Sequence, residues 1–373
     1  MRCGILPVVD LAEVLSRRLA TQQLSGSRAA KAVEVVRRLT CVQSQEHAHA
    51  FWSLGMRTTG MDAAAVRAEF DAGTFLRTHI LRPTWHFVAA EDLRWILAAT
   101  TERVQRANGT MLRREGLDEA LLGRGAGIVA DALTGHRHLS RAELGRVLAT
   151  AGLPGQGLGL VYVLMQAELE ALICSGPMRG STSTYALVDE RVPAGADRDG
   201  DLAELARRFF VGHGPASEAD LRRWASLTAA QSGPALAEAS SGLASVEIDG
   251  TRLWFDPDGP EPTPADEALL LPLYDEATLT YANLGFPVAD GHAHVPGTDQ
   301  FVGNVVLDGR NIGTWRREVK GRRIEVALDL APEVGAAGRR RAEQAAERLA
   351  AFLGRELVLE LRGPGTGEAS SLQ

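Results

Sequence analysis

One short residue pattern occurs twice in this chain, and it limits the folds that the chain can adopt. Ser140–Arg146 and Ser217–Arg223 both run from a serine to an acidic residue three positions later, and then to leucine and arginine. A serine in this place can accept a hydrogen bond from an amide in the first helical turn, and the acidic side chain suits the helix dipole. Each copy therefore predicts the beginning of a helix.

The segments after the two copies are also alike, because each predicts a second helix and then a hairpin. The first copy is followed by helical periodicity over 160–173 and by alternating residues over 177–188. The second is followed by a helix over 228–239 and by a hairpin over 244–255, centred on Asp249-Gly250, a strong turn signal. Helix, turn, helix and hairpin in this order are typical of a winged helix.

A third copy is predicted near the N-terminus. Leu11, Leu15 and Leu19 repeat at a helical spacing, residues 29–39 continue it, and residues 75–89 predict paired strands. A helix after these strands would join this unit to the next. An all-α bundle is the alternative for residues 1–240, but it accounts poorly for the hairpin signals.

The composition changes after Phe255. Residues 256–264 are rich in proline and can form neither a helix nor an inner strand. The chain beyond them predicts a small sheet or barrel, with hairpin turns at Asp308-Gly309 and Lys320-Gly321. The predicted elements are strands 269–273, 301–307, 311–317, 323–328 and 356–361, and one helix over 339–352.

The length of 373 residues exceeds what one hydrophobic core usually takes, and 45% hydrophobic with 23% charged residues is a globular balance. The predicted fold class is α+β, with three tandem winged-helix units followed by a small C-terminal β-barrel. The predicted bounds are 8–115, 116–195 and 196–260 for the three units, 265–362 for the barrel, and 363–373 for a disordered tail.

The formal net charge of −7 argues against non-specific binding to a polyanion, but the charge is unevenly distributed. Residues 1–114 hold 16 basic and 10 acidic side chains, a balance of +6, so the remainder carries −13. This asymmetry indicates that the N-terminal part meets an anionic partner. We expect a positive concave face on an otherwise acidic body.

Several classes of protein are not supported by the sequence. Cys3, Cys41 and Cys174 are too few and too widely separated for a disulfide framework or a CxxC zinc site. No signal peptide and no long apolar window is present, so we expect a soluble cytoplasmic protein. Motifs of dinucleotide, P-loop, serine hydrolase and zincin sites are absent from the sequence.

Three groups of polar residues could carry chemistry. Gln43 and Gln45 are two positions apart, so an extended backbone can point both into one cavity, although polar residues at a helix end usually act as caps. Asp275 and Glu276 could act as acid and base, but sequence neighbours rarely share a site. The third group, three His-x-His pairs without the other ligands of a zinc motif, is 47 with 49, 136 with 138, and 292 with 294.

Five segments, taken in order, resemble the AlkZ-like family of winged-helix DNA glycosylases. They are 42–45 with 54–57, then 82–88, 214–224, 271–276 and 306–316. The resemblance extends over about residues 10–362. It implies three tandem winged helices and a C-terminal β-barrel that together form a C-shaped clamp around duplex DNA.

The resemblance also implies functional residues. The catalytic Gln-x-Gln of the family falls on Gln43 and Gln45, and the amide at the second position places the chain in the branch linked to interstrand crosslinks and bulky adducts of natural-product alkylators. The activity implied is that of a monofunctional glycosylase, acting without a metal or other cofactor on double-stranded DNA that carries alkylated guanine, as a monomer in the nucleoid. The side chains predicted to contact the DNA are Arg57, Arg82, His86, Arg310 and Arg316.

An amide pair suits a leaving group that is already charged. Cleavage of an N-glycosidic bond normally needs a strong acid or a carboxylate. A guanine alkylated at N7 carries a positive charge and leaves as a neutral base, so two fixed amides need only orient a water and stabilise the sugar cation. Uncharged lesions should therefore be poor substrates.

A non-enzymatic protein is the alternative from a different functional class. The same winged-helix units would serve a DNA-binding regulator, or a protein that sequesters DNA or an alkylating drug. Such a protein would bind tightly without forming an abasic site, and a sequence-specific footprint would favour it.

Overall fold

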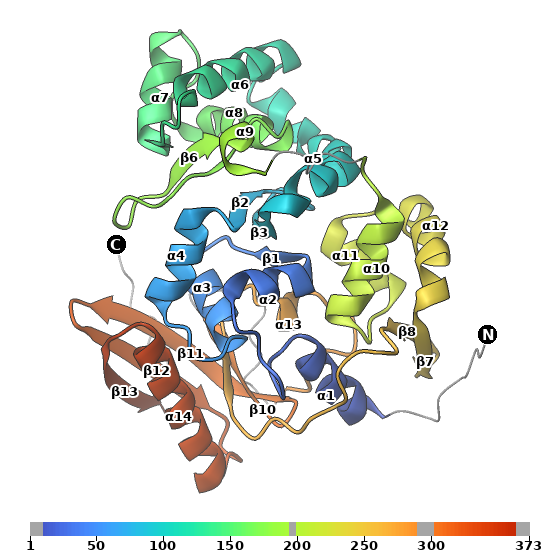
Figure 1. The fold of residues 1–373 in the computed structure, drawn as a ribbon. Coiled ribbons are helices and arrows are strands. Elements are labelled where there is room, and N and C mark those ends of the chain that lie inside the picture. The colour runs from blue at the N-terminus through green and yellow to red at the C-terminus, as the bar shows by residue number, and fades with distance from the viewer. Residues whose placement is uncertain (1–9, 194–198, 289–301, 363–373) are drawn as a thin grey trace.

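The computed structural model describes residues 10–193, 199–288 and 302–362 (Figure 1). The predicted disordered tail at 363–373, Cys3 and the histidine pair at 292 and 294 lie outside these residues. The architecture is mixed α and β, with several small sheets surrounded by helices. Within the described ranges, no helix has the length and apolarity needed to cross a bilayer.

The order helix, strand, helix, helix, strand, strand occurs in two groups of elements. The first group is α2 (Ala32–Leu39), β1 (Cys41–Gln43), α3 (His47–Met56), α4 (Ala63–Ala72), β2 (Phe75–His79) and β3 (Trp85–Ala89). The second is α6 (Glu119–Leu133), β4 (Leu139–Ser140), α7 (Arg141–Thr150), α8 (Gly157–Leu169), β5 (Ile173–Ser175) and β6 (Thr184–Leu187). Their sheets have the same strand order, β1-β3-β2 and β4-β6-β5.

A third group follows the same order, with a single bridging residue in place of its first strand. It consists of α10 (Leu202–His213), α11 (Glu218–Ala225), α12 (Ala229–Ala239), β7 (Ala244–Ile248) and β8 (Thr251–Phe255). Ala216 forms an isolated bridge to Trp254 of β8, which places it where β1 and β4 lie in the other groups. Figure 1 shows the first group in the middle of the molecule, with the second and third groups beside it.

Local hydrogen bonds account for the repeated helix starts. Ser140 and Ser217 cap α7 and α11, and the acids three residues later, Glu143 and Asp220, bond back to the serine amides at 2.6 and 2.7 Å. Both predicted helix starts are therefore confirmed. The predicted helix over 160–173 is too long, because the chain turns at Ala171, where φ is +54°, and then enters β5.

Among the described residues, three α-helices lie between or before the groups. α1 (Leu11–Thr21) begins at Asp10, whose carboxylate caps it at the Glu13 amide, and it contacts α10 of the third group. α5 (Leu93–Arg114) joins the first group to the second, as predicted. α9 (Val188–Arg191) is a single turn after β6.

The C-terminal part is an open sheet, which corrects the prediction of a barrel. The strands β9 (Leu269–Leu271), β10 (Gly303–Leu307), β11 (Arg310–Lys320), β12 (Arg323–Leu330) and β13 (Glu356–Arg362) lie in the order β13-β12-β11-β10-β9. In the described part of the chain β9 and β13 are the two edges and do not pair. The parallel pair β12 and β13 is connected through α14 (Ala336–Phe352), and this helix buries its apolar side chains in the same core as the sheet, so closure is not needed to cover them.

The largest core joins the first group to the C-terminal sheet. The rings of Phe51, Phe70 and Phe87 lie 5.7 Å apart, centre to centre, in each pairing. A side chain at Gly55 of α3 would come within 2.4 Å of the Phe352 ring, so α3 and α14 approach closely only because this position lacks one. This packing holds the first group against the C-terminal sheet and its helix.

Candidate active site at the end of strand β1

Gln43 and Gln45 line one small cavity at the end of β1. Gln43 is the last residue of the strand and pairs with His86 of β3, and the Ser44 amide donates to the Trp85 carbonyl at 2.8 Å. The cavity has a volume of about 10 Å³, which is roughly the space for the centre of one water molecule. Its other lining residues are Glu46, His49, Ala50, Ser53, Pro272, Leu273 and Tyr274.

The orientation of the Gln43 side chain is fixed by Arg82. The Arg82 Nη2 donates to Gln43 Oε1 at 2.7 Å, and a guanidinium can only donate, so the oxygen of the amide must face it. The same Nη2 lies 3.1 Å from His86 Nε2, and His86 Nδ1 donates to the Thr84 carbonyl at 3.0 Å. Burial and the neighbouring Arg82 lower the pKa of His86 to about 3, so its ring is neutral and accepts from Arg82.

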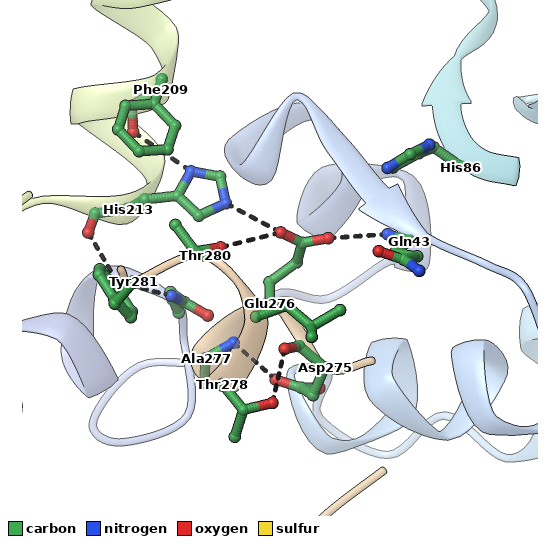
Figure 2. Close-up of polar contacts among 12 residues, drawn as sticks. Gln43, His86, Phe209, His213, Asp275, Glu276, Ala277, Thr278, Thr280 and Tyr281 are labelled. Carbon is green, nitrogen blue, oxygen red and sulfur yellow. Dashed lines mark hydrogen bonds and ion pairs between the residues drawn. The ribbon is translucent and has the colours of Figure 1, made fainter. Parts of the chain in front are cut away.

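The backbone of Gln43 is held from the opposite side by Glu276, in the short helix α13 (Glu276–Leu279). The Gln43 amide donates to Glu276 Oε1 at 2.8 Å (Figure 2). Glu276 Oε2 accepts from the Thr280 hydroxyl at 3.1 Å and lies 3.6 Å from His213 Nε2. Burial alone would raise the pKa of Glu276, but His213 and the positive charge of Arg82 lower it to about 2, so the carboxylate is ionised.

Gln45 is held by its backbone, whereas its side-chain oxygen has no partner. The Arg77 guanidinium donates to the Ser44 and Gln45 carbonyls at 2.8 and 3.1 Å and stacks over the Trp85 ring at 4.2 Å. Gln45 Oε1 is buried and accepts no hydrogen bond from any described residue. Buried polar atoms of this kind usually bind water, so Gln45 presents an acceptor at the cavity.

The structure corrects the predicted role of Arg57. Its guanidinium is completely buried and forms a two-bond ion pair with Asp275, at 2.9 and 2.8 Å. Its remaining N–H groups bond to Gln22 and Ser53. A guanidinium with no exposed surface and all its donors used cannot contact DNA, so Arg57 has a structural role.

The other predicted DNA contacts lie in different environments. His86 is fully buried behind Arg82, so it too has no surface to offer a phosphate. Arg82 is partly buried and bound to Gln43. Arg310 and Arg316 are exposed on β11 of the C-terminal sheet, and neither lines the cavity.

The adjacent acids Asp275 and Glu276 do not share a site. Asp275 also caps α13, where it accepts from the Ala277 amide at 2.9 Å (Figure 2). Its ion-pair partner is Arg57. Glu276 points to Gln43 and His213 instead. Their adjacency in the sequence makes both acids candidates for catalysis but does not reveal their partners, because nothing in the local pattern links positions 43, 213 and 276.

The first two histidine pairs also separate in the structure. His47 packs against the rings of Phe51 and Phe70, and His49 lies 6.0 Å from the Trp315 ring. Burial and nearby arginines lower the pKa of His47 to about 3 and of His49 to about 4, so both are neutral. The second pair, His136 and His138, lies between α6 and β4, away from this cavity.

Two comparisons with known proteins bear on the family and the fold of the chain. The sequence model of a family described as DNA glycosylase AlkZ-like matches residues 36–352. Among solved structures, the Streptomyces sahachiroi DNA glycosylase AlkZ superposes with a TM-score of 0.76 at 20% sequence identity, over 95% of this chain and 100% of that chain. No protein in the curated collection matches the sequence. At this identity, the superposition establishes a shared fold.

Proposed function

Because this chain belongs to the AlkZ-like DNA glycosylase family and is a DNA N-glycosylase, we propose that its substrates are guanines with a cationic N7-alkyl group in double-stranded DNA. The adducts would be bulky lesions or interstrand crosslinks from a natural-product alkylator. The enzyme would then serve in self-resistance, as a monomer in the cytoplasm, at the nucleoid. The family assignment favours this activity over a non-enzymatic regulator or a drug-sequestering protein.

The observation that supports the proposal is the pair of amides at a cavity with space for about one water. Gln45 Oε1 is an unpaired acceptor, and it would accept a hydrogen bond from the attacking water. Gln43 turns its oxygen to Arg82, which leaves its NH₂ group free to donate to the water or the sugar. These two contacts would hold the water without taking its proton, since an amide is not a base.

The chemistry then depends on the leaving group. The bond between C1′ and N9 breaks, and its electron pair neutralises the cationic guanine ring. Water oxygen forms the new bond to the sugar cation and releases its proton to solvent. Fixed dipoles at the reacting atoms can supply several kcal/mol of barrier reduction. An uncharged guanine lacks this leaving ability and would react slowly.

We propose that the three repeated groups of elements are winged helices, with the domain bounds 8–115, 116–195 and 196–260. Their element order and their shared sheet order support this interpretation. Together with the C-terminal sheet, whose proposed bounds are 265–362, they would form a C-shaped clamp on duplex DNA. Arg82, Arg310 and Arg316 are the proposed DNA contacts, and the exposed pair on β11 would bind phosphates.

The test is base release from a defined duplex. The enzyme is incubated with DNA that carries one N7-methylguanine or one bulky N7 adduct, and strand breakage at the abasic site is measured after heat or alkali. We expect breakage at the adducted guanine and none at an unmodified one. Adduct-dependent breakage that persists in a Gln43→Ala/Gln45→Ala double variant would reject the assigned site.

A further inference from the structure

Glu276 is a buried carboxylate that reaches Gln43 from a distant part of the chain. Its Oε1 accepts from the Gln43 amide at 2.8 Å across a sequence separation of 233 residues, and its side chain has no exposed surface. β1 is an edge strand of its sheet, and the amide of its last residue bonds to Glu276 instead of to β3. The carboxylate therefore supplies the partner that a further strand would otherwise provide.

Glu276 is itself held rigidly (Figure 2). The Thr280 hydroxyl donates to its Oε2 at 3.1 Å, and His213 Nε2 lies 3.6 Å from the same oxygen. His213 Nδ1 donates to the Phe209 carbonyl at 3.2 Å, and this bond keeps the opposite ring nitrogen turned toward the carboxylate. Glu276 thus joins β1 of the first group to α10 of the third.

We propose that Glu276 is a positioning residue for the glycosylase reaction. Its hydrogen bond fixes the backbone at the end of β1, and with it the place of the two glutamine side chains at the cavity. Arg82 fixes the other end of Gln43 through Oε1, so the residue is held at its backbone and at its side chain. This inference rests on the proposed function of Gln43 and Gln45.

The chemistry of the reaction makes such a fixed backbone important. A misplacement of about 1 Å can cost about 100-fold in rate when catalysis depends on orientation. The two glutamine side-chain amides exchange no protons with the water, so they contribute to the rate mainly by orienting it. Loss of the Glu276 bond should therefore slow base release more than it weakens DNA binding.

Asp220 of α11 provides a matched control. Like Glu276, Asp220 is a buried carboxylate, but it belongs to the third group. It accepts from the backbone amides of Ser217 and Ala282, both at 2.7 Å. Ala282 follows α13 closely, so Asp220 holds the same segment as Glu276 without contacting Gln43. Asp220→Asn removes one buried negative charge from this region and leaves the Gln43 bond in place.

The experiment measures single-turnover base release from a saturating duplex that carries one N7-methylguanine, with DNA affinity and thermal unfolding measured separately. Glu276→Ala removes the acceptor. Glu276→Asp keeps the charge, but its carboxylate ends one methylene short of the backbone N–H of Gln43. Both should slow release about 100-fold. Glu276→Gln keeps an acceptor oxygen and should stay within about tenfold of wild type. Asp220→Asn should keep the wild-type rate, and all variants should keep their DNA affinity.

The Asp and Gln variants decide the proposal even if Glu276→Ala does not fold. A folded Glu276→Asp that releases the base at the wild-type rate overturns it. A Glu276→Gln variant slower than Glu276→Asp also overturns it, because the charge and not the hydrogen bond would then matter. An Asp220→Asn variant as slow as Glu276→Ala overturns it as well. Wild type and Gln43→Ala/Gln45→Ala are measured in parallel. A wild type without base release rejects the proposed function and this inference together, whereas an active wild type with a fast Glu276→Asp rejects this inference alone.

Discussion

Asp275 and Glu276 are neighbours in the chain, yet they belong to two different regions of the molecule. Asp275 lies in a network with Arg57, Ser53, Gln22 and the Ala277 amide. In the described part of the chain, this network meets the cavity lining at Ser53 and at Pro272, whose carbonyl accepts from the Asp275 backbone amide. Glu276 bonds to Gln43, whose side chain lines the cavity. Equal burial therefore does not mean equal function: the first carboxylate holds the fold, and the second holds the proposed site.

The largest effect on stability is expected from breaking the first network. Arg57→Met leaves the Asp275 carboxylate buried without its partner, which should lower the free energy of unfolding by about 3 to 5 kcal/mol. Urea unfolding followed by circular dichroism measures this loss. Base release, measured at a low temperature where the variant remains folded, should stay close to wild type. A variant that is stable but slow would show that the two regions are not separate.

Substitutions of the two glutamines act on the second region, the cavity at the end of β1. Gln43→Ala and Gln45→Ala should each slow base release by about 100-fold or more, as the loss of a fixed dipole at reacting atoms does, while the free energy of unfolding changes little. Single-turnover rates and urea unfolding of the same preparations test the contrast. Gln45→Ala should be the less destabilising of the two, because Gln45 Oε1 has no partner to lose. A variant that is both slow and strongly destabilised would show that its glutamine holds the fold as well as the site.

A smaller effect is expected from Arg82→Met. The substitution frees Gln43 Oε1, so the amide can rotate, and we expect a rate about tenfold lower, the value of one hydrogen bond. The measurement is the single-turnover rate at saturating DNA, which separates this effect from weaker binding. Arg316→Met on β11 is the comparison, because it removes a guanidinium that does not contact Gln43. If both variants lose rate equally, Arg82 acts through charge and not through the Gln43 amide.

The contribution of Glu276 to stability should also be visible in the pH dependence of the free energy of unfolding. Its pKa is lowered to about 2 in the folded protein, compared with about 4.3 in an unfolded chain. A lowered folded pKa contributes stability that is complete above the unfolded value and is lost as pH falls toward the folded one. The free energy of unfolding should therefore decline between about pH 4.3 and pH 2, and Glu276→Gln should decline less steeply over this window. Parallel curves for the two proteins would contradict the assignment.

The smallest effect is expected from two exposed arginines of β11. Arg310→Ala and Arg316→Ala should each weaken binding to any duplex sequence alike and reduce the slope of log affinity against log salt by about one. Fluorescence anisotropy with unmodified DNA at several salt concentrations measures this slope. Arg57→Met should leave the slope unchanged, since its guanidinium is buried. An unchanged slope in both β11 variants would place the DNA elsewhere.

The sequence predicted those features that depend on hydrogen bonds between near neighbours. The serine caps of α7 and α11 and the turn at Asp249-Gly250, where φ is +48° and +72°, are confirmed because each is formed within about four residues. Gln43 and Gln45 could be singled out because both their spacing and the family motif can be read from the local sequence. Such features need no knowledge of the distant chain.

Tertiary structure decided everything that joins distant segments. Arg57 was predicted to face DNA, but Asp275 and Gln22 enclose it, and no local pattern specifies which arginine finds a buried carboxylate. The predicted barrel is an open sheet because α14 packs into its core. Glu276 reaches Gln43 because α13 packs against the first group, with His213 of the third group on its other side. The physical reason is that local bonds are fixed by spacing along the chain, whereas contacts across more than 200 residues depend on how whole layers bury their apolar faces.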